Sequence, residues 1–117
     1  MRRVAVLAEP VEEIRRLLLY ESEEGVYLFL SDAIEDAGSI ADEWYVSVAD
    51  AEKAVRARYG VKDSDWRDCP DPLPGCQHDW IAPVRVPGRD TGQPVWGTLE
   101  RLEDGVWRPL PVRKRRG

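Results

Sequence analysis

The residues best suited to chemistry lie in one stretch, from Trp66 to Pro83, which holds both cysteines and the only histidine. Their spacing is Cys69-x6-Cys76-x-His78-Asp79. Thiolates and imidazole are common zinc ligands, so this pattern raises the possibility of a metal site. Structural zinc sites usually pair cysteines two to four residues apart, and this chain has no other Cys or His. We therefore predict no cofactor and keep a metal at Cys69, Cys76 and His78 as the alternative.

A cysteine nucleophile is the second chemistry that this stretch allows. Cys76 and His78 would share a face of an extended segment, but thiol–imidazole pairs usually come from distant parts of a chain. The sequence contains no nucleophile elbow, Walker A or dinucleotide-binding motif. None of its 22 acidic residues can be assigned to a glycosidase-like pair. The balance is against an enzyme, and we predict no catalytic residue.

The prolines of the same stretch favour a stiff loop. The segment Asp71-Pro72-Leu73-Pro74-Gly75 is biased towards polyproline geometry followed by a turn. We expect the flanking indoles of Trp66 and Trp80 to cover one end of the core beneath this loop. The alternative is a ligand site at the loop. Its candidate residues are Trp66, Cys69, Cys76, His78, Asp79 and Trp80.

Acidic residues form the other marked pattern. Between Leu17 and Glu52 there are ten acids and no basic residue. A surface field of one sign attracts partners of the opposite sign. We therefore predict a non-enzymatic binding or regulatory module, resembling an immunity protein or an inhibitor in its action, that recognises a basic protein surface. The predicted acidic face comprises Glu21, Glu23, Glu24, Asp32, Glu35, Asp36, Asp42 and Glu43.

The charge distribution restricts other partners. Because Arg113, Lys114, Arg115 and Arg116 supply +4 of the net charge of −5, residues 1–111 carry −9. Such a body disfavours nucleic acid, whose binding depends on clustered Lys and Arg. No stretch approaches the roughly 20 apolar residues of a membrane span, and the first apolar run is too short for a signal peptide. We predict a cytoplasmic protein with reduced thiols and no membrane partner.

The elements that must position these residues follow from local patterns. Residues 10–21 fit a helix start or a strand, and Ser22-Glu23-Glu24-Gly25 resembles a hairpin turn, so we favour the hairpin. Arg3–Ala8, closed by Pro10, predicts an edge strand. Glu43–Ser47 predicts a further strand. Ser47 and Gly60 have the positions of an N-cap and a C-terminal stop around a helix over about 48–59.

The remaining pattern predicts a second hairpin and completes the fold class. Val95–Leu102 and Val106–Leu110 flank Glu103-Asp104-Gly105, which resembles the first turn. We predict an α+β fold in which one main helix packs on an antiparallel sheet of about four to six strands, with a proline-rich loop over 66–83. A chain of 117 residues fits one domain, here 1–111, followed by a basic tail over 112–117. No pattern in the sequence identifies a protein family.

Overall fold

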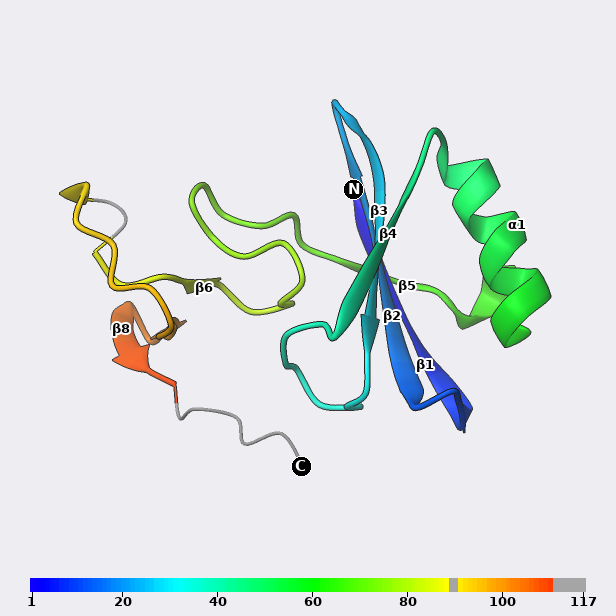
Figure 1. Ribbon diagram of the computed structural model, residues 1–117, viewed down its shortest axis with the longest axis horizontal. Helices are drawn as coiled ribbons and strands as arrows, with labels where there is room; N and C mark the ends of the chain where they lie inside the picture. Colours follow the sequence, from blue (N-terminus) through cyan, green and yellow to red (C-terminus); the bar gives the residue numbers. More distant parts are fainter. Residues whose placement is uncertain (89–90, 111–117) are drawn as a thin grey trace. The chain divides into compact units, whose positions relative to one another are not determined.

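The computed structural model describes residues 1–88 and 91–110 (Figure 1). The chain divides into two compact units, unit 1 over Met1–Asp71 and unit 2 from Pro72 onward. The domain boundaries proposed from the sequence, 1–111 and 112–117, stay a prediction. The basic tail lies outside the described residues.

Unit 1 is built on a five-stranded antiparallel sheet with one helix, which confirms the predicted α+β class. The strand order across the sheet is β4-β3-β2-β1-β5, so consecutive strands are neighbours except for β5, which returns beside β1. The strands are β1 (Arg2–Val11), β2 (Ile14–Ser22), β3 (Gly25–Ser31), β4 (Ala41–Tyr45) and β5 (Arg67–Cys69).

The β2–β3 hairpin confirms the strand interpretation of the residues before Ser22. Ser22 pairs with Gly25, so Glu23 and Glu24 alone form the turn. Gly25 has a φ of +137°, a backbone conformation that favours glycine. Matching apolar runs favour this register, in which Leu17 faces Leu30 and Leu19 faces Leu28 within the core.

Strand β1 differs from the prediction of a short edge strand over Arg3–Ala8. It extends from Arg2 to Val11 and lies between β2 and β5. Strand β5 pairs only with Arg2, Arg3 and Val4. Pro10 falls beyond that contact, where the pairing with β2 is irregular between Val6 and Val11. A proline is tolerated there because no regular ladder requires its missing N–H.

Helix α1 (Val48–Tyr59) has the predicted boundaries and follows β4. The Ser47 hydroxyl accepts a hydrogen bond from the Asp50 N–H at 3.1 Å. At the other end, Gly60 is left-handed with a φ of +70°, and its N–H donates to the Arg56 carbonyl at 3.1 Å. An N-cap of this kind contributes about 1 kcal/mol. The short 3₁₀ helix η1 (Asp63–Asp65) then leads to β5.

The core of unit 1 lies between α1 and one face of the sheet. Alternate residues of β2 and β3 point into it, as the strand period of two requires. Burying each large aliphatic side chain contributes about 1.5–3 kcal/mol, so this face dominates the stability of unit 1. The buried members are Ala5, Leu7, Ile14, Leu17, Leu19, Val26, Leu28, Leu30, Ala51, Val55, Tyr59 and Val61, with Trp66 among the partly buried side chains packed against them.

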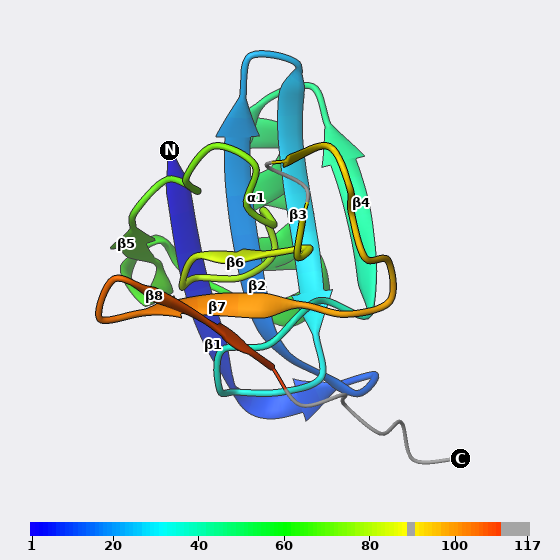
Figure 2. The same cartoon turned by 90° about the vertical axis from the view of Figure 1, so that its left-hand side faces the viewer.

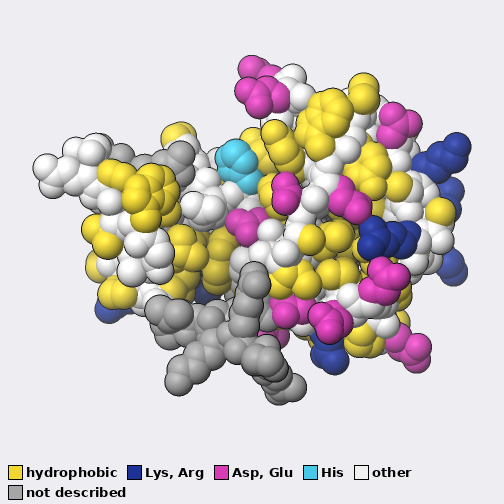
Figure 3. All heavy atoms as spheres, viewed as in Figure 1, with side chains coloured by type: hydrophobic (Ala, Val, Ile, Leu, Met, Phe, Trp, Pro, Cys, Tyr) yellow, Lys and Arg dark blue, Asp and Glu magenta, His cyan; other side chains and the backbone are white. Residues whose placement is uncertain are grey.

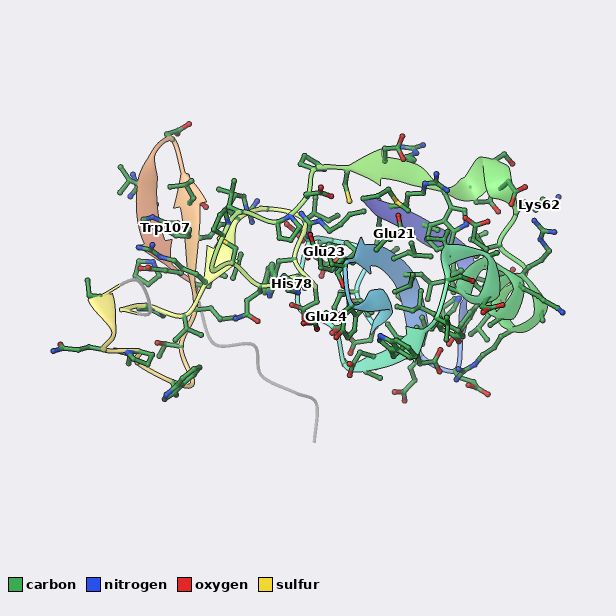
Figure 4. The ribbon with its side chains drawn as sticks, turned by 90° about the horizontal axis from the view of Figure 1, so that it is seen from above. Glu21, Glu23, Glu24, Lys62, His78 and Trp107 are labelled. Carbon is green, nitrogen blue, oxygen red and sulfur yellow. The ribbon has the colours of Figure 1, made fainter. Side chains whose placement is uncertain are left out.

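Unit 2 contains a smaller antiparallel sheet of order β6-β7-β8. Its strands are β6 (Val84–Arg85), β7 (Glu100–Glu103) and β8 (Val106–Pro109). The β7–β8 hairpin confirms the second predicted hairpin, although its first strand begins only at Glu100. Arg85 bridges the sheet, because its Nε lies 2.6 Å from a Glu100 carboxylate oxygen and its guanidinium lies 3.8 Å from the centre of the Trp107 ring. Trp107 is labelled in Figure 4.

Candidate functional site

The eight acids of the predicted face do not lie together. Glu21, Glu23 and Glu24 lie where β2 turns into β3 (Figure 4). Asp32, Glu35 and Asp36 lie in the β3–β4 connection, and Asp42 and Glu43 lie in β4 itself. The seven residues of β3 place the first two groups roughly 20 Å apart. The structure therefore divides the predicted face into separate acidic groups.

Two of these acids are paired with arginines of unit 1. Glu43 lies 2.9 Å from the Arg58 guanidinium and accepts a hydrogen bond from the Tyr45 hydroxyl at 3.0 Å. Burial and this contact with Glu43 raise the pKa of Tyr45, so its hydroxyl stays a donor at neutral pH. Asp36 lies 3.7 Å from the Arg16 guanidinium. These contacts compensate charge within the chain and leave less of it for a partner.

Arg16 also fixes the shape of the β3–β4 connection. Its side chain is only 2% exposed and donates to the carbonyls of Glu35 at 2.8 Å and Ala37 at 2.7 Å. A buried guanidinium needs such acceptors because its charge is costly to remove from water. The connection thus folds around a buried arginine through two of its carbonyls and the Asp36 carboxylate, and we assign Arg16 a role in holding the loop.

The β2–β3 turn is different, because its acids are exposed and the turn is held by a neutral side chain. The Ser22 hydroxyl accepts from the Glu24 N–H at 3.2 Å and donates to the Gly25 carbonyl at 3.1 Å. Within the described residues, no cation forms an ion pair with Glu21, Glu23 or Glu24. Glu21 pairs with Val26 and therefore points to the face that carries α1.

Trp44 lies at the same end of the sheet as the β2–β3 turn. It pairs with Tyr27 on the face away from α1, and its indole lies across the Cα of Gly25. A Cβ added at Gly25 would lie 2.5 Å from the indole nitrogen, so only glycine leaves room for the ring. Trp44 is nevertheless 52% exposed, and Val46, two residues further, is 75% exposed. An aromatic ring held in place yet open to solvent is suited to binding.

We define Glu23, Glu24, Trp44 and Val46 as the hairpin-end site. Figure 3 shows acidic side chains projecting at the upper end of unit 1 beside hydrophobic ones. The sequence prediction included the two glutamates but not Trp44 or Val46. The missing signal was the strand period of two at Trp44-Tyr45, which places Tyr45 on the core side and Trp44 outward. Val46 follows the end of β4 and is exposed.

The residues of the predicted loop site belong to different units. Trp66 and Cys69 are part of unit 1, whereas Cys76, His78, Asp79 and Trp80 are part of unit 2. Residues 67–69 of the predicted loop form strand β5. Burial raises the pKa of the Cys69 thiol above its ordinary value, with nearby Arg2 acting in the opposite direction. A thiol of raised pKa is mostly protonated at neutral pH and is a poor nucleophile or metal ligand.

A metal site would need several ligands in one place. Across residues 1–88 and 91–110 there is no group of three or more His, Cys, Asp or Glu side chains placed to hold a metal ion. The described part of the chain also contains no helix long and apolar enough to cross a membrane.

No protein-family model matches the chain, and neither does any curated protein or solved structure.

Proposed function

We propose that this protein is a non-enzymatic binding module that recognises a basic segment or surface of a partner protein through the hairpin-end site. The observation that carries the proposal is the exposed Trp44 indole, held over Gly25 next to the turn of Glu23 and Glu24, two exposed acids that form no ion pair with any described residue. An indole face attracts Arg and Lys cations, and adjacent carboxylates add a second attraction to the same charge.

The proposed site is prepared for binding before the partner arrives. Ser22 holds the turn through two hydrogen bonds, and the Gly25 backbone supports the Trp44 ring. Less conformational freedom is then lost on association, which improves affinity without adding contacts. Tryptophan is also enriched among the residues that dominate binding energy at protein interfaces.

The net charge of −9 over residues 1–111 supports fast association with a basic partner. An inhibitor or immunity protein directed at a cationic effector is one instance of this function, and a small regulatory subunit is another. We propose the cytoplasm as the compartment. A cysteine- or metal-centred activity has less support, because the pKa of Cys69 is raised and Cys76 and His78 belong to the other unit.

The test uses a nine-residue peptide of alternating arginine and threonine as a defined basic partner. We expect its affinity for the protein to fall steeply between 0.05 and 0.3 M salt, because the screening length is only about 8 Å at 0.15 M. The double variant Glu23→Lys/Glu24→Lys should weaken binding by at least about tenfold at low salt. Isothermal titration would measure both effects.

A matched control separates a site from general charge attraction. Glu9 and Glu13 are exposed and lie near the β1–β2 turn, at the opposite end of β2. The nine residues of β2 place that turn roughly 30 Å away, well beyond the screening length. Glu9→Lys/Glu13→Lys changes the net charge equally and should weaken binding by less than about threefold. Equal losses in the two double variants would contradict the proposed site.

A further inference from the structure

We propose that the basic partner segment binds as an additional β-strand along the outer edge of β4. This inference deepens the proposed function, on which it depends, by naming how the partner is held. In such β-augmentation the main-chain hydrogen bonds supply affinity and alternate side chains supply specificity. The two edges of the five-stranded sheet differ, and the side chains of β4 suit a basic strand.

The sheet of unit 1 has one protected edge. On that side, β5 has only three residues and is followed by Pro70, whose carbonyl accepts from Arg2 Nε at 2.6 Å. Where β5 no longer flanks it, β1 carries Pro10 in an irregular stretch. Short edge strands, prolines and irregular pairing are the usual means of preventing another strand from adding to a sheet.

The β4 edge lacks these protections. Its five residues pair with β3 without a break, from Ala41 opposite Leu30 to Tyr45 opposite Val26. Strand β4 contains no proline and no lysine, and it ends the strand order of the described sheet. Figure 2 shows β4 at the side of the sheet, with β3 as its neighbour. The backbone N–H and C=O groups on the outer side of β4 are therefore those of an edge strand, with which another strand can pair.

The side chains of β4 determine which strand fits. Asp42 and Trp44 are two residues apart, so they lie on the same face, and both are exposed. Arginines at every second position of an added strand would also share one face and would meet this carboxylate and indole. Adding a second copy of β4 instead would bring acidic residues against acidic residues, which is destabilising. The occupant is thus an extended basic segment of a partner.

The experiment compares the arginine–threonine peptide with the same peptide methylated on every backbone nitrogen, which keeps the side chains but cannot donate to a strand. We expect methylation to lower affinity by at least about tenfold, because several main-chain hydrogen bonds are lost. Amide hydrogen exchange of the protein, followed by NMR, should slow at least about tenfold at alternate residues of β4 when the unmethylated peptide binds. The Glu23→Lys/Glu24→Lys variant is tested in parallel.

The outcomes separate the two proposals. Equal affinity of both peptides, with unchanged exchange in β4, overturns strand addition and leaves the hairpin-end site in place if the double variant still weakens binding. If the double variant binds the peptide as tightly as the parent protein does, the proposed function is overturned, and this inference with it. In the protein without peptide, amide exchange of β4 could slow as the protein concentration rises. That result would identify a second copy of the chain as the occupant and overturn the proposal of a basic segment.

Discussion

The two hairpins of this protein have nearly the same residues at their turns, Glu-Glu-Gly-Val-Tyr and Glu-Asp-Gly-Val-Trp, yet they use glycine differently. In the β2–β3 hairpin, Gly25 is already paired with Ser22 and belongs to β3. In the β7–β8 hairpin, Glu103 pairs with Val106, so Asp104 and Gly105 form the turn itself. Their φ values of +51° and +78° are those of a type I′ turn.

The prediction that both hairpins share one turn chemistry was therefore wrong. Each hairpin has a two-residue turn, but the turn is shifted by one residue relative to the glycine. In unit 1 the register is fixed by the apolar residues of β2 and β3, whereas the short β7 and β8 leave the turn residues to decide. The position of a glycine relative to a hairpin turn thus depends on whether the apolar strand residues or the turn residues set the strand register.

The difference has a consequence for function. Gly25 lies beneath Trp44 of a third strand, whereas a Cβ on Gly105 would meet no heavy atom within 4 Å among the described residues. The acids also differ, because Glu103 lies 3.7 Å from the Arg108 guanidinium and Glu23 and Glu24 have no such partner among the described residues. Among the described residues, the first hairpin alone combines an aromatic ring held over its own glycine with two turn acids that both lack an ion pair.

The largest expected effect is that of Gly25→Val. A β-branched residue is strained at a positive φ, and its Cβ would displace the Trp44 ring, so we expect a loss of about 2–4 kcal/mol in unfolding free energy. Gly105→Val should introduce only the backbone strain of a positive φ and lower the unfolding free energy by about 1–3 kcal/mol. Urea unfolding of both variants would measure the difference. In a Trp44→Ala background, Gly25→Val and Gly105→Val should lower the unfolding free energy by similar amounts. Equal losses for the two substitutions in the parent protein would contradict the role of Trp44.

Next in size is the effect of Trp44→Ala on binding. Truncating an aromatic residue that dominates an interface costs about 2 kcal/mol, or roughly 30-fold in affinity, which titration with the arginine–threonine peptide would measure. Stability should change by less than about 1 kcal/mol because the ring is half exposed. Trp96→Ala is the control, since Trp96 is 71% exposed and belongs to unit 2. A similar loss in that variant would remove Trp44 from its proposed role.

A smaller contrast concerns the residue that precedes each turn. Ser22→Ala removes two hydrogen bonds that hold the first turn and should lower the unfolding free energy by about 1 kcal/mol. The equivalent change in the second hairpin, Glu103→Ala, removes an exposed ion pair and should cost at most about 0.5 kcal/mol. Thermal unfolding would rank the two, and the reverse order would show that Ser22 does not hold its turn.

Local signals were enough to predict much of the fold. The helix boundaries followed from Ser47 and Gly60, which satisfy backbone groups within a few residues of themselves. The β2–β3 hairpin followed from two apolar runs on either side of a turn. Such signals act between residues close in sequence, so their physical basis is present in the sequence itself. The candidate acids of the turn were found for the same reason.

Long-range pairing could not be predicted in this way. Nothing near Arg2 indicates that β5, more than sixty residues later, will pair beside it and make β1 an interior strand. Nothing near Cys69 indicates that it ends a strand of unit 1 while Cys76 belongs to unit 2. These outcomes depend on which distant segments bury the most apolar surface together, a property of the assembled chain.

The sequence by itself determined the α+β class, the capped helix, the hairpins and the acidic charge, because each depends on residue type and short spacing. Tertiary structure alone decided which acids are compensated, since the pairing of Glu43 with Arg58 requires α1 to lie against the sheet. It also decided that Trp44 lies over Gly25, because residues nineteen positions apart meet only when β3 and β4 are in register. The proposed binding surface therefore depends on the pairing of these strands.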